Sequence, residues 1–454
     1  MKVAFHTLGC KVNQYETESM AEMFRDRGYT VTDEREFADV YVINTCTVTS
    51  VADRKSRQYI RRMKKVNPDA VVAVTGCYAQ VEPGQVSSIE GVDVVAGTNE
   101  KSCLISYIEK FMEDRERSLH VRKREGLSVY DETGSVTSAE NRTRAYIKIQ
   151  EGCDRFCSYC VIPYARGASR SRRLEDIVEE ASGLVASGYR ELVLTGINTA
   201  LYDMENTAVR KDGVELREED MPDEPFGVEK AVAALDRLPG DFRIRLSSLE
   251  PSVVNAAYVR RLFKYRRLCH HLHLSAQSGS DRVLHAMNRP YDRGQYMEIV
   301  KTLKEFDPFY GISTDIIVGF PGEKERDFEE SCSLVEEAGF CRTHIFKYSK
   351  RPFTAAADMK EQVAPQVKNR RSDMLHEIGE KTAVKFCREN SGRKTDVLFE
   401  EYLDEGLITG YTGNYMRVYV PCPSPERGMA LVNTFGEVEL ETPVRDGIRG
   451  HLIL

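Results

Sequence analysis

Three cysteines, Cys153, Cys157 and Cys160, lie at spacings of four and three residues in one short segment. An iron–sulfur cube normally binds four cysteine thiolates. A segment that supplies only three leaves one iron open to a substrate or a cofactor. The spacing therefore predicts a cluster that does chemistry rather than one that only transfers electrons. The alternative is a structural zinc site that lacks one ligand, but such sites favour paired Cys-x-x-Cys motifs and the sequence has no second pair.

A second set of three cysteines lies in the first part of the chain. Apolar runs of strand length at residues 2–8, 40–44, 70–75 and 92–96 alternate with amphipathic stretches at 16–27 and 51–66, which predicts a doubly wound parallel sheet. Cys10, Cys46 and Cys77 each follow one of the first three runs. Parallel strands end at the same edge of a sheet, where ligands bind, so we expect the three thiols to meet there. The alternative is three buried cysteines of the core.

The middle of the chain repeats strand and helix. Expected strands are at 145–149, 191–195, 243–249, 271–276, 313–318 and 343–348, with helices such as 174–187 and 296–305 between them. This pattern predicts an incomplete (β/α)6 barrel rather than a closed eight-stranded one. Catalytic groups of such barrels lie on the loops that follow the strands, and the Cys153 segment follows the first strand.

The last part of the chain changes period. Short expected strands at 395–399, 407–411, 415–420, 429–433 and 437–441 are separated by Gly, Asn and Pro, which predicts a small all-β barrel. We therefore expect an α/β protein with domains at 1–120, 140–385 and 386–454 and a linker at 121–139. Residues 392–454 carry six Lys and Arg against ten Asp and Glu, a net charge of −4, which disfavours RNA binding unless the charges are segregated.

Composition limits the class of protein. The 454 residues have a net charge of −7 and contain no apolar run of membrane-spanning length. The apolar run at the N-terminus breaks too early for a signal peptide. Twelve cysteines in such a chain indicate a reducing compartment and metal ligands rather than disulfides. We expect a cytoplasmic monomer without a membrane partner.

The motifs resemble those of a known family. Residues 146–167 are similar to the cluster loop of radical S-adenosylmethionine (SAM) enzymes. Residues 9–13, 44–49 and 75–80 resemble the N-terminal motifs of methylthiotransferases, and 275–281, 315–323 and 348–352 match their barrel. Residues 410–415 resemble the RNA-binding TRAM barrel. The resemblance covers nearly the whole chain, and around Cys46 and Cys153 it is greatest to the branch that acts on N6-threonylcarbamoyladenosine beside the anticodon of tRNA.

This resemblance implies the cofactors and the reaction. One [4Fe–4S] cluster on Cys153, Cys157 and Cys160 would bind SAM and cleave it to a 5′-deoxyadenosyl radical, which removes the hydrogen from adenine C2. A second [4Fe–4S] cluster on Cys10, Cys46 and Cys77 would hold the sulfur that another SAM methylates, so that a methylthio group reaches C2. An electron donor such as a flavodoxin or ferredoxin would supply the reducing electron.

The resemblance also assigns residues to SAM. The positions that match the family's cofactor-facing edge are Thr195, Gly196, Ser247, Gln277, Asp315 and Gly319. Each could instead be a polar strand end or a turn glycine. One departure from the family is Phe353, which stands where glycine is usual, and we expect its loop to keep its place with less flexibility.

Basic clusters are candidates for RNA contacts. The first is a helical face with Arg54, Arg57, Arg61, Lys64 and Lys65. The second follows the Cys153 segment and contains Arg166, Arg170, Arg172 and Arg173, which we expect to position phosphates near the cluster. The third contains Arg260, Arg261, Lys264, Arg266 and Arg267. Such runs are otherwise solvated faces.

Two further readings of the function remain. A sister specificity, for isopentenyladenosine in tRNA or an aspartate of a ribosomal protein, shares both clusters. An iron–sulfur electron carrier or sensor is the reading from another class, and it would not need a SAM-binding barrel.

Overall fold

The first part of the chain is a parallel sheet with helices on both faces. The computed structural model describes residues 1–134, 143–204, 218–403 and 405–453. The sheet has the order β2-β1-β3-β4-β5-β6. Its strands are β1 (Lys2–Thr7), β2 (Thr30–Thr32), β3 (Val40–Thr45), β4 (Val71–Gly76), β5 (Val94–Ala96) and β6 (Ser118–His120). Its helices are α1 (Lys11–Asp26), α2 (Ser50–Val66), α3 (Cys77–Val81), α4 (Pro83–Ser87) and α5 (Leu104–Asp114), with a 3-10 turn at Lys101–Cys103.

Alternation along the buried strands explains the two layers of helices. In β3, Tyr41 and Ile43 face one apolar core, whereas Val40 and Val42 face another. Successive side chains of a strand point to opposite faces, so a sheet covered on both sides needs strands that are apolar throughout. The predicted doubly wound sheet is confirmed, and helix α1 begins five residues earlier than residue 16, directly after Cys10.

The middle of the chain forms an open parallel barrel. Its strands are β7 (Arg144–Lys148), β10 (Glu191–Thr195), β11 (Arg243–Leu246), β12 (Ser248–Leu249), β13 (His271–Leu274), β14 (Gly311–Val318) and β15 (Arg342–Lys347). They pair as β11-β10-β7 and as β12-β13-β14-β15, because the expected strand at 243–249 is interrupted at Ser247. A bridge between Ile244 and Leu268 continues the sheet across the interruption. The predicted barrel of parallel units is confirmed.

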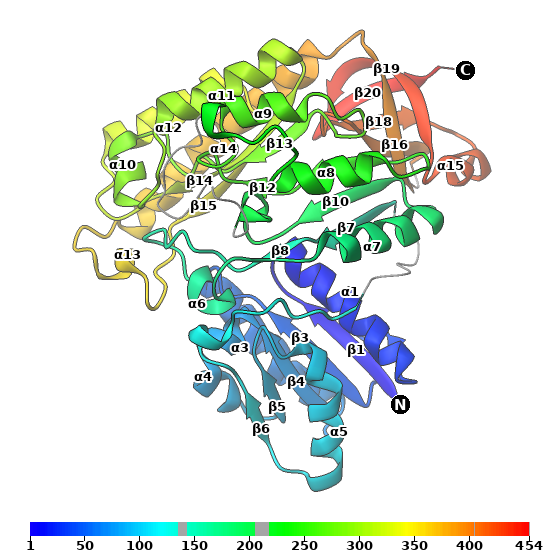
Figure 1. Ribbon diagram of the computed structural model, residues 1–454, viewed down its shortest axis with the longest axis vertical. Helices are drawn as coiled ribbons and strands as arrows, with labels where there is room; N and C mark the ends of the chain where they lie inside the picture. Colours follow the sequence, from blue (N-terminus) through cyan, green and yellow to red (C-terminus); the bar gives the residue numbers. More distant parts are fainter. Residues whose placement is uncertain (135–142, 205–217, 404, 454) are drawn as a thin grey trace.

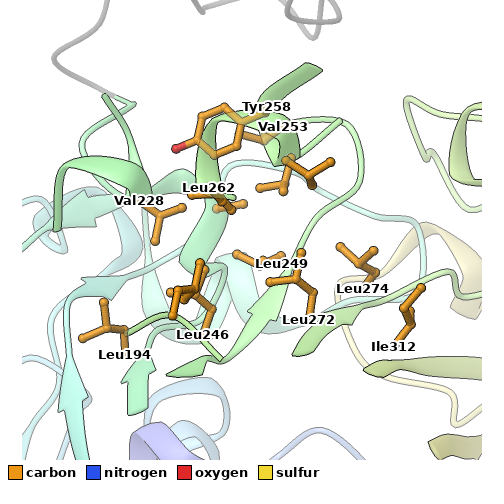
Figure 2. Packing of buried hydrophobic residues seen from close by; sticks show 14 of the residues in the cluster. Leu194, Val228, Leu246, Leu249, Val253, Tyr258, Leu262, Leu272, Leu274 and Ile312 are labelled. Carbon is orange, nitrogen blue, oxygen red and sulfur yellow. The ribbon is translucent and has the colours of Figure 1, made fainter. Parts of the chain in front are cut away.

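Helices cover the outside of this barrel. They are α7 (Leu174–Ala186), α8 (Val228–Asp236), α9 (Ala256–Leu262), α10 (Asp281–Ala286), α11 (Arg293–Phe306), α12 (Glu325–Ala338) and α14 (Pro365–Glu389), with 3-10 turns at Thr199–Leu201 and Glu218–Asp220. Two shorter helices lie elsewhere: α6 (Ile162–Arg166) packs against α3 of the N-terminal part, and α13 (Ala355–Asp358) lies in the segment after β15. Figure 2 shows how strand residues such as Leu194, Leu246 and Leu272 pack under Val228 and Leu262 of the helices. Each fully buried leucine contributes about 2 kcal/mol through apolar burial.

The last part of the chain is a closed barrel of the TRAM type. Its strands are β16 (Lys394–Leu403), β17 (Leu407–Thr412), β18 (Arg417–Pro421), β19 (Phe435–Val444) and β20 (Gly447–Leu452), in the order β16-β17-β18-β20-β19. The strand expected at 429–433 is wrong, because α15 (Pro425–Leu431) occupies this segment. Ser424 caps that helix by accepting a hydrogen bond from Arg427 N, and Pro425 fits its first turn. The predicted barrel fold is nevertheless confirmed.

The three parts pack against one another. In Figure 1 the blue N-terminal sheet lies below the green and yellow core, and the red barrel lies beside the core at the upper right. Of the predicted linker at 121–139, residues 135–139 lie outside the described residues. The described part, which includes a 3-10 turn at Arg124–Gly126, runs between the sheet and the core. Ser19 Oγ donates to Thr133 O at 2.7 Å and Tyr130 Oη donates to Lys148 O at 3.0 Å.

Candidate functional site

The segment that carries Cys153, Cys157 and Cys160 leaves the end of the first barrel strand. Two short strands, β8 (Gln150–Glu151) and β9 (Arg170–Ser171), pair antiparallel and close its base. Cys153 N donates to Gly167 O at 3.0 Å, so the chain returns on itself. Gly152 has a φ of +74°, and a Cβ there would lie 1.8 Å from Ala168 O, so only glycine fits. This base fixes where the three cysteines begin.

Polar contacts hold the tip of the cluster loop (residues 153–160). Ser158 N donates to Met287 O at 3.0 Å and Ser158 Oγ donates to Ala286 O at 2.8 Å. Ala356 N in turn donates to Ser158 O at 2.7 Å. The loop is therefore fastened to α10 on one side and to α13 on the other, which orders it before any metal binds.

Glu250, directly after β12, is a buried acid beneath the cluster loop. It accepts from Arg155 Nε at 2.6 Å and from Asn198 Nδ2 at 2.8 Å, and Arg289 lies 3.8 Å away. Arg289 Nη1 also donates to Cys157 Sγ at 3.4 Å. Burial by itself would raise the pKa of Glu250, but Arg155 and Arg289 hold it below its usual value. This group of polar side chains around Glu250 was not predicted, and its only signal in the sequence is an acid placed directly after a barrel strand.

The other three cysteines lie at the ends of neighbouring strands. Cys10 follows β1, Cys46 follows β3 and Cys77 follows β4, and these strands are adjacent in the sheet. Burial, with a smaller contribution from the nearby Cys77 and Cys10, raises the pKa of the Cys46 thiol to about 12. The three thiols therefore lie near one another at this edge of the sheet, and their role as metal ligands stays a prediction. Gly9 keeps room among them, because a Cβ there would lie 2.9 Å from Cys46 Sγ.

The two cysteine sets face one another. Cys77 and Val81 of α3 pack against Val161 and Ala165 beside the cluster loop in one apolar cluster. Burial raises the pKa of Cys160 to about 12, and Cys157 and Cys77 also contribute, so thiols of both sets are neighbours. In the described part of the chain, no three His, Cys, Asp or Glu side chains are arranged to hold a single metal ion. Three thiolates of an iron–sulfur cube bind three different irons and so stand farther apart than the ligands of one ion.

The arginines after the cluster loop are internal. Arg166 is fully buried and pairs with Glu16 of α1 and with Glu151. Arg170 donates to Arg166 O and Asn99 Oδ1, and the buried Arg172 pairs with acids at positions 132 and 180. The expectation that this group positions RNA phosphates is therefore wrong for all but the exposed Arg173. A buried charge needs partners, and these arginines find them across the junction of sheet and core.

The residues expected to bind SAM lie along the ends of the barrel strands. Gln277 and Asp315 line a pocket together with Cys160 and with residues 346–349, at and just beyond the end of β15. Asp315 accepts hydrogen bonds from His273 Nε2 and Ser275 Oγ, each at 3.0 Å. This pocket opens beside the cluster loop, as a SAM site requires, but the role of each residue stays a prediction.

The other four positions lie apart from this pocket's lining. Thr195 Oγ1 donates to Ser247 Oγ at 3.3 Å, and Gly196 packs against Gln150. Gly319 N donates to Glu323, and the side chain of Lys368 covers the place of its missing Cβ.

Of the remaining basic clusters, α2 presents the larger outward face. Arg54, Lys55, Arg61, Arg62 and Lys65 are exposed on it. Arg57 instead donates to Tyr78 Oη at 3.0 Å, and Lys64 pairs with Asp93 at 2.9 Å. In the third cluster, Arg261 and Lys264 pair with the buried Glu229 at 2.7 and 3.0 Å. Arg260 and Arg266 of the same cluster are exposed.

Comparison with known proteins agrees with this geometry. Residues 2–97 match the family described as Uncharacterized protein family UPF0004, and residues 147–335 match the Radical SAM superfamily. The threonylcarbamoyladenosine tRNA methylthiotransferase MtaB of Bacillus subtilis is 42% identical over 92% of this chain and 89% of its own length. The chain belongs to the radical SAM methylthiotransferase family.

Other members of the family are similar over comparable lengths. MtaB of Aquifex aeolicus is 38% identical over 88% of this chain and 93% of its own. The tRNA-2-methylthio-N(6)-dimethylallyladenosine synthase of Carboxydothermus hydrogenoformans is 34% identical over 89% of this chain and 90% of its own. Membership of the superfamily implies a [4Fe–4S] cluster and SAM for this methylthiotransferase. It excludes the alternative hypothesis that the protein is only an iron–sulfur electron carrier or sensor.

A solved structure shares the fold of this methylthiotransferase. The radical SAM methyltransferase TsrM of Kitasatospora setae, solved with tryptophan and a SAM analogue, has a TM-score of 0.54 at 15% identity over 78% of this chain and 75% of its own. Within the described ranges we find no helix with the length and apolar character needed to cross a membrane.

Proposed function

We propose that this chain transfers a methylthio group to C2 of N6-threonylcarbamoyladenosine in tRNA, using two [4Fe–4S] clusters. The observation that carries the proposal is the convergence of two sets of three cysteines, one at the sheet edge and one on the barrel loop. The similarity to MtaB proteins over about nine-tenths of the chain supports the substrate.

The donor sets fit such clusters. Each set supplies three thiols, and burial raises the pKa of Cys46 and of Cys160 to about 12, so both are protonated in the free protein. Metal binding deprotonates such thiols, and coordination to the metal offsets the cost of burying the thiolates. When bound, the cluster on Cys153, Cys157 and Cys160 with SAM would supply the one-electron chemistry that breaks the adenine C2–H bond, and the cluster on Cys10, Cys46 and Cys77 would supply the sulfur.

The chain's own residues support these roles. Arg289 donates to Cys157 Sγ and Arg166 donates to Cys77 Sγ, so each set receives one buried positive charge. Hydrogen bonds and charge at cluster sulfurs tune the reduction potential. The apolar side chains of Val81 and Val161 close the junction between the sets and exclude water there. Gln277 and Asp315 would orient SAM in the pocket beside Cys160.

The test is nucleoside analysis of tRNA treated with the reconstituted protein, SAM and a reductant. We expect the 2-methylthio derivative of threonylcarbamoyladenosine from tRNA that carries this nucleoside, and no product from tRNA that carries isopentenyladenosine. The reverse pattern would replace the proposed substrate by that of the sister specificity. Product from neither RNA would contradict the proposal.

A further inference from the structure

Three aromatic side chains form a surface cluster beside the cluster loop. Phe156 lies within that loop, Tyr164 lies on α6, and Phe353 lies in the segment between β15 and α13. The ring centroids of Phe156 and Tyr164 are 5.9 Å apart, and those of Tyr164 and Phe353 are 5.8 Å apart. Figure 1 shows the segment around α13 on the same side of the molecule as α6. We call these three residues the aromatic cluster.

Two members of the aromatic cluster, Phe156 and Phe353, have conformations and exposures that cost free energy in the folded chain without a partner. Phe353 is 63% exposed and Phe156 is 39% exposed, so both leave apolar surface in water. Both also have positive φ, +64° and +41°, a backbone conformation that costs free energy for a bulky residue. Exposed rings at strained positions next to a site indicate a partner that covers them.

Positive charge flanks the aromatic cluster on two sides. The guanidinium of Arg124 lies over the ring of Phe156, 4.9 Å from its centroid. The segment that carries Phe353 is tied to the start of α2, because Arg351 pairs with Asp53 at 2.7 Å and Ser50 N donates to Ser349 Oγ at 3.2 Å. The exposed basic face of α2 therefore begins next to the aromatic cluster.

Rings flanked by cations fit one kind of partner. Unpaired bases stack on aromatic side chains, and cations beside them meet the phosphates of the same strand. We propose that Phe156, Tyr164 and Phe353 form a stacking platform for unpaired bases of the substrate RNA, next to the nucleoside that enters the barrel. This inference rests on the proposed function, since it assumes an RNA substrate. It adds the protein residues that would hold the unpaired bases of that RNA.

Fluorescence tests the platform directly because the chain contains no tryptophan. Phe353→Trp places a single indole in the aromatic cluster. Phe37→Trp is the matched control, because Phe37 is 60% exposed and precedes β3, at the opposite end of that strand from Cys46. The probe is an anticodon stem-loop RNA that carries threonylcarbamoyladenosine, titrated against the reconstituted variants. We expect the RNA to quench the emission of Phe353→Trp and to leave that of Phe37→Trp unchanged.

A second variant separates binding from folding. Phe353→Gly removes the ring and relieves the positive φ, so its melting temperature should not fall. Its KM for the RNA should rise about tenfold, which is the usual effect of losing one stacked base. If the ring had only a structural role, Phe353→Gly would lower the melting temperature and leave the KM for the RNA unchanged.

The outcomes distinguish the two proposals. If the wild-type protein methylthiolates the RNA but Phe353→Trp emission and Phe353→Gly KM do not respond, the stacking platform is wrong and the proposed function stands. If the wild-type protein neither binds nor modifies the RNA, the proposed function fails. Quenching by a protein reductant but not by RNA would assign the aromatic cluster to a protein partner and overturn the platform.

Discussion

Arg166 Nε donates to Cys77 Sγ at 3.2 Å, so a side chain of the barrel contacts a cysteine of the N-terminal sheet. The same guanidinium binds Asn13 Oδ1 at 2.5 Å and pairs with Glu16 and Glu151. Burial by itself would raise the pKa of Glu16, but the charge of Arg166, with the neighbouring lysines, holds it well below its usual value. One buried cation therefore joins the two halves of the candidate site.

Replacing Arg166 should destabilise the protein strongly. Arg166→Met leaves Glu16 and Glu151 buried with fewer partners, and loss of one member of a buried ionic network costs about 3 kcal/mol or more. Urea unfolding followed by circular dichroism measures this loss. Arg173→Met is the control, because its side chain is 74% exposed, and it should have little effect. Equal stability of the two variants would show that the network does not join the domains.

Glu191 should make the attachment of the C-terminal barrel sensitive to acid. Its carboxylate pairs with Arg243 at 2.5 Å and Arg245 at 2.8 Å, and Arg245 also donates to Gly413 O of the barrel. Burial by itself would raise the pKa of Glu191, but these arginines lower it well below its usual value. A depressed carboxyl pKa contributes stability above the unfolded pKa of about 4.3, and this stability is lost as pH falls below it.

Glu191→Gln should therefore lose about 3 kcal/mol of stability at pH 7, and the difference from the wild type should shrink below about pH 4. Thermal unfolding across this pH range measures both effects. Glu437→Gln, at an exposed position of β19, is the control that should follow the wild type. A difference that does not change with pH would contradict the assignment of this charge.

The two cysteine sets should have separable roles. Cys157→Ala removes a ligand of the cluster beside SAM, so reductive SAM cleavage should disappear. Cys46→Ala should retain SAM cleavage but form no methylthio product, because the sulfur source is lost. Chromatography of methionine and 5′-deoxyadenosine, with nucleoside analysis of the tRNA, gives both readouts. A methylthio product from Cys46→Ala would show that Cys10, Cys46 and Cys77 do not hold the sulfur.

The exposed face of α2 should contribute charge to RNA affinity. Arg61→Gln with Lys65→Gln removes two outward cations, so binding should weaken and the slope of log affinity against log salt should fall by about two. Filter binding of tRNA at several salt concentrations measures the slope. Arg326→Gln, on α12 with 89% side-chain exposure, should leave it unchanged. If the α2 variant keeps the wild-type slope, this face does not meet phosphates.

The apolar runs of the sequence and the order of parallel strands explain which parts of the fold and the site could be predicted. Cys10, Cys46 and Cys77 each followed an apolar run, and parallel topology placed them together. The segment at 429–433 was misread because its apolar residues suggested a strand, whereas Ser424 and Pro425 start a helix. The predicted domain boundary after residue 385 falls within α14, which ends at Glu389. The domain boundaries stay predictions.

Long-range pairing accounts for the rest. Arg166, Arg170 and Arg172 resembled a solvated basic run because their acidic partners lie far away in the sequence, as Glu16 does. Glu250 was missed for the same reason, since only the fold brings Arg155 and Arg289 to it. Phe353 was noted as a departure, but its exposure and positive φ appear only in the structure.

The measurement that tests the central claim most directly is iron and labile sulfide per chain after anaerobic reconstitution, with Mössbauer spectra to identify the clusters. Two cubes predict about eight iron and about eight sulfide per chain, all in [4Fe–4S] form, and about half of each in Cys157→Ala. About four of each in the wild type would leave one cluster, and Cys10, Cys46 and Cys77 would then be structural thiols.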